Sequence, residues 1–302
     1  PVHAQDPQEE AHGGEAEGYS ADVRDAQAVA DALKRAHDNF GPIDVLVSGA
    51  AGNFLAPALG MSANGFKTVV DIDLLGSFNV LRAPPEFLRR PGASVINISA
   101  SQAFNPTKFQ AHVCAAKAGV DMLTRVLAME WGPDGVRVNS IVPGPIADTE
   151  GMRRLAPTDE ARARMTSVIP LGRYGTTGEI ADMAMVLSSP LAAYVTGVVL
   201  PVDGGISLAG GRDFSAAFAA APARPLSQPR AEPWRRFPIP VATTSPLSSA
   251  TCAAAKKMRR PREVTRAVAI AAVPSPLAMK CVVRPRVTAS SAGSPGSTYK
   301  PE

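Results

Sequence analysis

The sequence has few residues of the kinds that cross-link a small protein or bind a metal. Its 302 residues include three cysteines, at positions 114, 252 and 281, which form neither an even set nor a Cys-x-x-Cys pair. The four histidines show no metal-ligand spacing, so we expect no bound metal. These absences exclude a disulfide-rich scaffold, and they fit a reducing compartment, which we predict to be the cytoplasm.

Long apolar runs and targeting signals are also missing. No apolar run reaches the ~18 residues of a transmembrane helix, so we expect no membrane partner. The chain begins at Pro1 without a signal-peptide pattern and ends in Tyr-Lys-Pro-Glu, which is not a peroxisomal address. The sequence therefore gives no reason to place the protein outside the cytoplasm.

Charge is distributed unevenly along the chain. Residues 1–210 carry 16 Lys+Arg and 23 Asp+Glu, a net of −7, whereas residues 211–302 carry 15 and 4, a net of +11. The mildly acidic first part gives no reason to predict nucleic acid as a partner. The second part holds 13 of the 28 prolines and shows no periodicity, so we interpret it as a disordered basic tail. Its Lys256–Arg260 run leaves a nucleic-acid or membrane patch, or a wrong reading frame, as alternatives.

Four short apolar runs predict buried strands that alternate with helices. This alternation is typical of a parallel sheet covered on both faces, so we predict an α/β fold with a doubly wound, Rossmann-type sheet. A further strand is expected at Tyr19–Val23, followed by a helix that Asp25 caps and Gly41 ends. The four runs are Ile43–Val47, Ser94–Ser99, Val136–Val142 and Val198–Val202, and the other predicted helices are Ser62–Leu81, Phe109–Trp131 and Thr177–Leu187.

Seven short motifs follow one another in the order and spacing of the short-chain dehydrogenases/reductases. Each is weak alone, but the ordered set resembles that superfamily over residues 19–210. The versions present here, among them Gly-Ala-Ala-Gly-Asn-Phe and Pro-Gly-Pro-Ile, resemble the 2,4-dienoyl-CoA reductase branch, particularly its peroxisomal-type members and their bacterial relatives. The motifs are Asp22-Val23, Gly49–Phe54, Asp71-Ile72-Asp73, Asn97-Ile98-Ser99, Lys117, Pro143–Ile146 and Asp203-Gly204-Gly205.

The resemblance implies a dinucleotide cofactor, NADPH, at the carboxyl ends of the strands. It assigns the Asp22 side chain to the adenine amino group, the Val23 backbone to the adenine ring and Lys117 to the nicotinamide ribose. Small residues in a turn let a ligand approach the backbone closely. A helix-capping Asp, a tight turn and a plain loop are the structural alternatives. The other residues implied in cofactor binding are Gly49, Ala50, Ala51 and Gly52 in the turn and Pro143, Gly144, Ile146 and Thr149 in the loop.

The catalytic positions depart from the usual pattern of the superfamily. Counting back from Lys117 puts the usual tyrosine position at Val113 and the usual serine position at Ala100, and neither side chain can transfer a proton. The neighbouring His112 points about 100° away from position 113 on a helix. The chain therefore lacks the phenol that serves carbonyl–alcohol exchange. Reduction of a conjugated dienoyl thioester needs only a positioned cofactor, stabilisation of the thioester oxygen and a held water.

The resemblance implies that Lys117 and Asp73 are the catalytic residues in reduction of 2,4-dienoyl-CoA to 3-enoyl-CoA. Lys117 would add positive potential near the developing dienolate, and Asp73 would hold the water that protonates the α carbon. We expect the two to form an ion pair, with the Asp73 pKa lowered by its partner and raised by burial. A surface lysine and a structural aspartate are the alternatives. Asn53, Phe54 and Gln110 would shape the pocket for the acyl-CoA substrate, or only pack.

The glycine-rich phosphate loop that opens a complete superfamily member is missing. Such a member begins with a strand, a Thr-Gly-xxx-Gly-x-Gly loop and a helix, but here the third strand is reached by residue 19. We therefore predict a sheet that lacks its first β-α-β units, exposes the edges beside the absent central strand and binds dinucleotide poorly. The chain then divides into a disordered lead-in (1–18), an incomplete domain (19–210) and a tail (211–302).

Two alternatives to the interpretation as a dienoyl-CoA reductase stay open. One is a short-chain reductase of another enoyl or carbonyl substrate. The other is a non-catalytic fragment that acts, if at all, by association with full-length partners. The resemblance also implies that the intact parent is a homotetramer, assembled through the two long helices predicted at 62–81 and 109–131.

Overall fold

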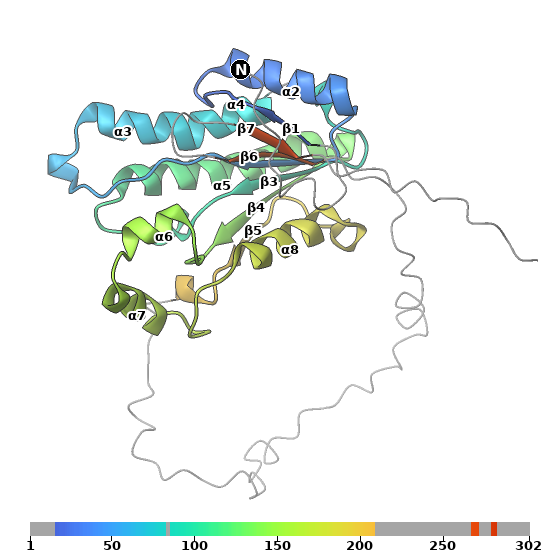
Figure 1. Cartoon of the computed structure of the whole chain (residues 1–302). Helices are drawn as coiled ribbons and strands as arrows, with labels where there is room; N and C mark the ends of the chain where they lie inside the picture. Colours follow the sequence, from blue (N-terminus) through green and yellow to red (C-terminus); the bar gives the residue numbers. More distant parts are fainter. Residues whose placement is uncertain (1–15, 83–84, 209–266, 272–278, 283–302) are drawn as a thin grey trace, which may run out of the picture. The chain divides into compact units, whose positions relative to one another are not determined.

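The computed structural model of the chain describes residues 16–82, 85–208, 267–271 and 279–282, and its centre is a single sheet (Figure 1). Within these residues seven strands are hydrogen-bonded in the order β1-β7-β6-β2-β3-β4-β5. The run from β2 to β5 is a parallel four-stranded sheet, as predicted for a Rossmann-type fold. The strands are β1 Ala16–Tyr19, β2 Val45–Gly49, β3 Ser94–Ile98, β4 Arg137–Pro143, β5 Val199–Val202, β6 Ala267–Ala271 and β7 Met279–Val282.

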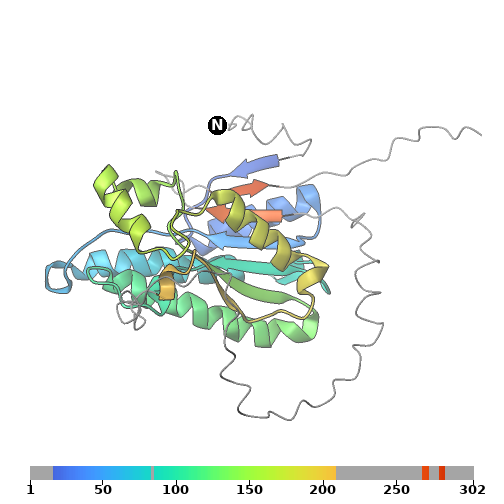
Figure 2. The same ribbon diagram turned by 90° about the horizontal axis from the view of Figure 1, so that it is seen from below.

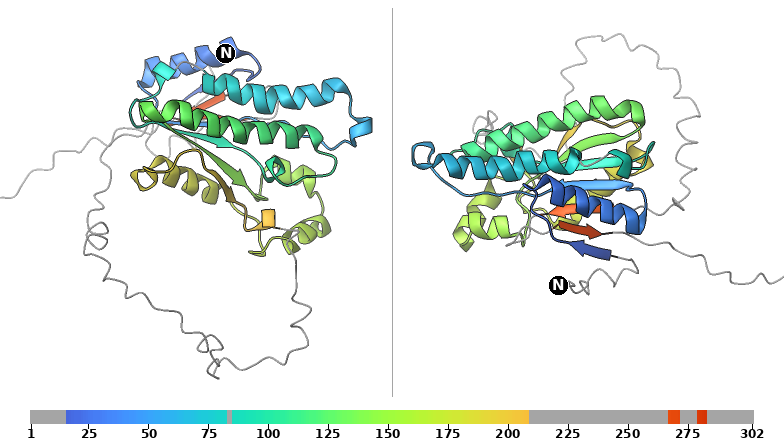
Figure 3. Two further views of the ribbon diagram at one scale, coloured as in Figure 1. Left: turned by 180° about the vertical axis from the view of Figure 1, so that it is seen from behind. Right: turned by 90° about the horizontal axis from the view of Figure 1, so that it is seen from above.

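Helices cover both faces of this sheet. The helices α2 to α5 lie in front of the strands in the view from above in Figure 3, whereas α8 lies in front of them in the view from below in Figure 2. None of the helices in the described ranges has the length and apolarity needed to cross a bilayer. The helices are α2 Ala26–Phe40, α3 Ala63–Val70, α4 Gly76–Arg82, α5 Ala111–Trp131, α6 Glu150–Leu155, α7 Asp159–Ser167 and α8 Thr177–Ser188.

Adjacent residues of β3 explain why its apolar run is continuous. Val95 and Ile96 are both fully buried, but successive side chains of a strand point to opposite faces. Val95 belongs to the core on the side of α2, together with Val29. Ile96 belongs to the core on the other side, together with Leu187 of α8. A strand covered on both faces needs apolar residues in both registers, which is the pattern from which the parallel sheet was predicted.

The first predicted strand lies elsewhere than expected. The sequence predicted Tyr19–Val23, but β1 ends at Tyr19 and pairs antiparallel with β7. The alternating residues 19, 21 and 23 are all buried, as a strand would require, yet the backbone turns after Tyr19. The turn is closed by hydrogen bonds from the Asp25 N–H to the Asp22 carbonyl and from the Arg24 N–H to the Asp22 carboxylate, both 2.9 Å. The predicted cap is confirmed, because Asp25 accepts from two N–H groups at the start of α2.

The sheet edge that the sequence left open at β2 is covered. β6 pairs with β2 in parallel, from Val45 opposite Ala267 to Gly49 opposite Ala271. The prediction of an exposed edge at β2 is therefore wrong. The sequence did not predict strands β6 and β7 within 211–302. The rest of that predicted tail, including Lys256–Arg260, lies outside the described residues, as do residues 1–15 of the predicted lead-in.

The long helix predicted at Ser62–Leu81 is interrupted by one wider turn. Ser62 caps α3, and α4 continues the helical run to Arg82. Between them Asp71–Leu75 form a π-helical turn. Single π turns inside α-helices are frequently found at functional sites, and this one contains Asp73.

Replacing Gly76 by alanine is expected to lower the free energy of unfolding by about 1–3 kcal/mol, because an added Cβ would lie 2.7 Å from Val23 Cγ2. Gly151→Ala is the matched control, because no heavy atom lies within 4 Å of a Cβ at that helical position. The control is expected to be neutral or to stabilise by up to about 1 kcal/mol. Urea denaturation measures both variants. Equal midpoints would show that the loop after β1 does not pack against α4.

Candidate active site

Asp73 joins the long helix to the turn that follows β2. Its Oδ1 accepts a hydrogen bond of 2.6 Å from the backbone N–H of Gly52. The side chain of Ile72 lies 3.2 Å from where a Gly52 Cβ would stand, so the helix and the turn are in close contact there. The π-helical turn and the small residues after β2 together place a carboxylate at the carboxyl end of the sheet.

Lys117 meets this carboxylate from α5. Its Nζ donates to the carbonyl of Ile98, at the end of β3, over 3.1 Å and lies 3.5 Å from Asp73 Oδ2. Both side chains are buried, with 6% of Lys117 and 1% of Asp73 exposed. An ammonium has three N–H donors, so these two contacts leave a third N–H for a ligand. The ion pair expected from the sequence is present, while the catalytic roles of its members stay predictions.

Burial is the largest influence on the pKa of Asp73. It raises the pKa of the carboxyl above the ordinary value, and the charge of Lys117 and the Gly52 N–H oppose that rise only in part. The sequence indicated that burial and the ion pair shift the Asp73 pKa in opposite directions, but not which effect is larger. In the structure the effect of burial is the larger. A proton on this group resides on Oδ2, because Oδ1 accepts the Gly52 hydrogen bond.

A second buried carboxylate, which the sequence analysis missed, lies one helical turn from Lys117. Asp121 is 4% exposed and accepts a 3.2 Å hydrogen bond from the Ser140 hydroxyl. Burial raises its pKa, while the hydrogen bonds it accepts and the charge of Lys117 act in the opposite direction. The i, i+4 spacing of 117 and 121 was the available signal. Lys117 therefore pairs with Asp73, while Asp121 is held mainly by hydrogen bonds from hydroxyl groups.

The predicted substrate residues lie together on one side of this pair. Gln110 Nε2 donates to Asn53 Oδ1 over 3.1 Å, and Gln110 Oε1 accepts from Gln102 Nε2 over 3.0 Å. The ring of Phe54 packs edge-on against His112 with the centroids 4.4 Å apart. His112 is fully buried, and the sequence analysis set it aside because of its offset from position 113. The structure therefore adds His112 to the set Asn53, Phe54 and Gln110.

No hydroxyl occupies the two positions at which the superfamily usually carries serine and tyrosine. Val113 is buried in α5 and Ala100 follows β3. Two buried carboxyls, Asp73 and Asp121, lie on the elements around Lys117. The arrangement can therefore hold a proton on a carboxyl and present a positive charge, but it has no phenol to offer at these positions.

The predicted cofactor residues fall into two groups. Gly49, Ala50 and Ala51 lead from β2 to Gly52 and so belong to the Asp73 site. Pro143 ends β4, and the Gly144 N–H that follows donates to Val202 over 3.1 Å. An added Cβ on Gly144 would lie 2.6 Å from the Asp203 backbone, so packing against β5 already accounts for a glycine there.

Three further residues that were predicted to bind the cofactor form hydrogen bonds to other residues of the chain. Thr149 caps α6 by accepting a hydrogen bond from the Met152 N–H, and its hydroxyl donates to the Ile146 carbonyl over 2.9 Å. Asp22 accepts two 3.0 Å hydrogen bonds from Arg24, which lower the pKa of its carboxyl. The Val23 carbonyl accepts from Asn79 Nδ2 over 2.9 Å.

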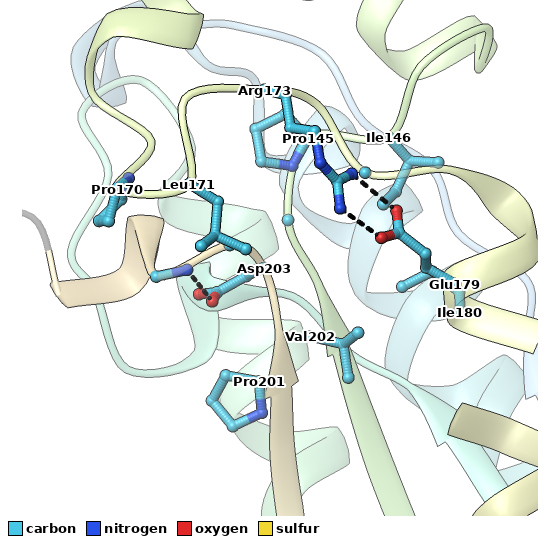
Figure 4. Close-up of a pocket in the computed structure, with 14 residues that line it drawn as sticks. Pro145, Ile146, Pro170, Leu171, Arg173, Glu179, Ile180, Pro201, Val202 and Asp203 are labelled. Atoms are coloured by element: carbon cyan, nitrogen blue, oxygen red, sulfur yellow. Dashed lines mark hydrogen bonds and ion pairs between the residues drawn. The ribbon is translucent and has the colours of Figure 1, made fainter. Parts of the chain in front are cut away.

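A hollow of about 450 Å³ opens beyond the ends of β4 and β5 (Figure 4). Gly144 and Ile146 line it, and so do Arg173 and Glu179, which form an ion pair of 2.6 Å across its wall. Neither Asp73 nor Lys117 lines this hollow, so the Lys117–Asp73 pair lies outside it.

The residues around Lys117 fit the nicotinamide and ribose end of a dinucleotide. A buried ammonium with an N–H to spare and a turn of small residues suit hydroxyl groups and a flat ring. The described residues contain no glycine-rich strand–loop–helix for the pyrophosphate. Nor do they contain a cluster of three or more side chains able to hold a metal ion.

Comparisons with known proteins place these residues in a wider group. Residues 3–207 match the family model described as Enoyl-(Acyl carrier protein) reductase. The peroxisomal 2,4-dienoyl-CoA reductase of Rattus norvegicus, named as producing (3E)-enoyl-CoA, is 51% identical over 188 residues, which cover 62% of this chain and 64% of the rat protein. The chain thus matches just under two thirds of that relative's length.

Solved structures with the same arrangement of strands and helices carry related names. A short chain dehydrogenase from Bacillus anthracis is 37% identical with a TM-score of 0.53, over 62% of this chain and 73% of that one. A gluconate 5-dehydrogenase from Burkholderia cenocepacia, solved in complex with NADP and tartrate, is 29% identical with a TM-score of 0.60, over 63% and 75%.

Proposed function

The chain belongs to the short-chain dehydrogenase/reductase superfamily, and on that premise we propose that it carries the site of an NADPH-dependent reductase of 2,4-dienoyl-CoA, giving 3-enoyl-CoA. One observation carries the proposal. A buried Lys117–Asp73 pair stands where Ala100 and Val113 supply no hydroxyl. Reduction of a conjugated thioester needs a positive charge and a proton source at this place, and it needs no phenol.

The cofactor residues of the proposal are those of the turn after β2, Lys117 and the loop after β4. Lys117 would hold the nicotinamide ribose through the N–H that its two contacts leave over. The reduced cofactor, when bound, supplies a hydride to the δ carbon of the substrate. The preference for NADPH over NADH rests on the resemblance, and an NADP complex is known for one structural relative.

Side chains of the protein would stabilise the negative charge that develops on the substrate and would supply the proton. As electrons move toward the thioester oxygen, the buried Lys117 ammonium opposes the negative charge that develops there, an effect that low dielectric strengthens. Asp73, whose pKa burial raises, would hold a proton above its ordinary range and pass it through a water to the α carbon. Asn53, Phe54 and Gln110 would bound the acyl chain.

The proposal also covers partners and place in the cell. An acyl-CoA is the expected small-molecule partner, and a homotetramer through α3–α4 and α5 the expected assembly. We expect neither nucleic acid nor membrane as a partner. The cytoplasm remains our proposed location, although the rat relative is named as peroxisomal.

A version of the chain preceded by a family-type strand–loop–helix is expected to oxidise NADPH in the presence of 2,4-hexadienoyl-CoA and not in the presence of a simple ketone, whereas the chain by itself is expected to bind NADPH poorly. Following the loss of dienoyl absorbance measures the reaction. Calorimetry with NADPH, on this chain and on a version preceded by a family-type strand–loop–helix, separates binding from chemistry. Activity with the ketone would favour a reductase of another substrate. Failure of both versions to bind NADPH would favour the non-catalytic alternative.

A further inference from the structure

His112 carries a buried donor that the proposed reaction has not yet used. It is the second residue of α5, and its side chain is 0% exposed. Its Nδ1 accepts a 2.9 Å hydrogen bond from the backbone N–H of Val113. A ring nitrogen that accepts an N–H carries no proton, so the neutral ring has its proton on Nε2. That Nε2–H is buried without a hydrogen-bond partner among the described residues.

The surroundings place this donor beside the candidate catalytic pair. Phe54, two residues after the Gly52 that binds Asp73, packs its ring at 90° against the imidazole. The turn Gly52–Phe54 thus contacts Asp73 through its first residue and His112 through its last. His112 and Asp73 are therefore polar groups of one buried neighbourhood, with the partly exposed Phe54 beside them.

Asp73 has an open position that matches this donor. Its Oδ1 is taken by the Gly52 N–H, whereas Oδ2 has no hydrogen-bond partner within the described part of the chain and only the 3.5 Å ion contact with Lys117. Buried polar atoms left over in this way are usually satisfied by an internal water, provided that it finds two or more polar partners. Nε2 and Oδ2 supply two.

We propose that His112 Nε2–H and Asp73 Oδ2 hold one buried water between them, and that His112 positions this water for proton delivery to the α carbon. The second half of the statement rests on the proposed function, whereas the first does not. When Asp73 carries its proton on Oδ2, both groups donate to the water and occupy its two lone pairs. The hydrogens of the water are then directed to the remaining side, where the acyl chain would lie.

Asp73 alone replaces the proton that the water gives to the substrate. The water gives one proton to the α carbon and takes the Oδ2 proton of Asp73 in exchange, so the product gains one proton, the carboxyl loses one and the water is restored. The imidazole keeps its Nε2 proton throughout. His112 is thus a positioning residue that acts through the water.

Crystal structures of the full chain, in the wild-type and His112→Phe forms, test the water without any need for activity. We expect one water within hydrogen-bond distance of both His112 Nε2 and Asp73 Oδ2 in the wild type, and its loss in the variant. Phenylalanine keeps a ring against Phe54 but has no donor. A wild-type site in which no water touches both atoms overturns the proposal.

Kinetics with 2,4-hexadienoyl-CoA test what the water does. His112→Phe is expected to lower kcat about 10- to 100-fold and to raise the solvent deuterium isotope effect, with KM within about threefold, because a misplaced proton donor slows only the proton transfer. His112→Gln, which returns an N–H near the Nε2 position, is expected to restore most of kcat. Cys114→Ala, on the same helix turn, is the control and should behave as wild type.

The outcomes separate the two proposals. An unchanged kcat and isotope effect in His112→Phe would show that the imidazole does not position the proton donor, and a change confined to KM would make it a pocket wall; either result overturns the positioning role. If the version preceded by a family-type strand–loop–helix reduces no dienoyl-CoA, the proposed function and the positioning role with it are contradicted, and the crystal structures then decide the water alone.

Discussion

Replacing Lys117 by methionine is expected to lower the free energy of unfolding by about 3–5 kcal/mol at neutral pH. Methionine matches the stem of lysine in length and removes the ammonium group, with its charge and its hydrogen bond to the Ile98 carbonyl. The change leaves Asp73 in the interior without its ion-pair partner, and it removes the charge that also stabilises ionised Asp121. Urea denaturation followed by far-ultraviolet circular dichroism measures the loss.

The loss is expected to grow with pH. Burial raises the Asp73 pKa in the folded protein above the 3.8 of an unperturbed Asp, and without Lys117 the rise is larger. A carboxyl of this kind binds its proton more readily when folded, so its contribution to stability is fully present below the unfolded pKa and is lost as the pH rises through the folded pKa. The Lys117→Met variant should therefore lie closer to wild type at pH 5 than at pH 8.

Two further variants make this test specific. Lys117→Met combined with Asp73→Asn should recover at least half of the lost stability, because it removes the unpaired charge and keeps an acceptor for the Gly52 N–H. Lys34→Met is the matched control, since the Lys34–Asp38 ion pair is exposed, and it should cost at most about 0.5 kcal/mol. A Lys117→Met variant as stable as this control would mean that the buried pair is solvated in the native protein.

The Asp73→Asn variant is expected to lower kcat for 2,4-hexadienoyl-CoA about 10²- to 10³-fold, because an amide supplies no proton. Asparagine retains an oxygen for the Gly52 hydrogen bond and has nearly the same shape. The Kd of NADPH and the KM of the acyl-CoA should therefore change little. Steady-state kinetics and calorimetry on the same preparation measure the three quantities.

The pH profile gives this prediction a second readout. The proton donor is the protonated carboxyl, whose pKa burial raises, so the wild-type kcat should fall as the pH rises through that pKa. The fall should be absent from the residual activity of Asp73→Asn. If the variant keeps both the wild-type kcat and the falling limb, the carboxyl only fixes the turn after β2, and the proton comes from another group.

The parts of the fold that follow from local rules were predictable from the sequence. Helix α2 begins after the Asp25 cap and ends at Gly41, whose φ of 82° favours a residue without a side chain. The four strands β2 to β5 appear within a few residues of their predicted bounds, because buried parallel strands have apolar residues on both faces.

The parts that depend on distant pairing were not predictable. Tyr19–Val23 has the alternation of a strand, but the hydrogen bonds of Asp22 close a turn that periodicity alone does not show. The π-helical turn at Asp71–Leu75 leaves no mark on helical spacing. Strands β6 and β7 lie in a part of the sequence without hydrophobic periodicity. Only the structure shows which strands they pair with.

Some features of the site were likewise predictable from the sequence, and others were not. The contact between Asp73 and Lys117 was expected from the family resemblance, and the structure has it at 3.5 Å. The sequence could not show which of two opposing effects sets the Asp73 pKa, because that depends on how completely the carboxyl is buried. His112 was passed over because one residue of offset turns a side chain by about 100° on a helix, yet another element, here the turn carrying Phe54, can lie on that side.

The pairing of β6 with β2 matters for the protein while it is still on the ribosome. β2 ends at position 49 and its neighbour begins at position 267. At roughly 5–20 residues per second, translation needs about 10–45 s to cover that distance. During this interval one edge of β2 is unpaired, because β6 has not yet been synthesised. A nascent chain on a neighbouring ribosome or a chaperone can bind that edge before β6 does. The yield of native protein should therefore depend on translation speed through the segment between these two strands.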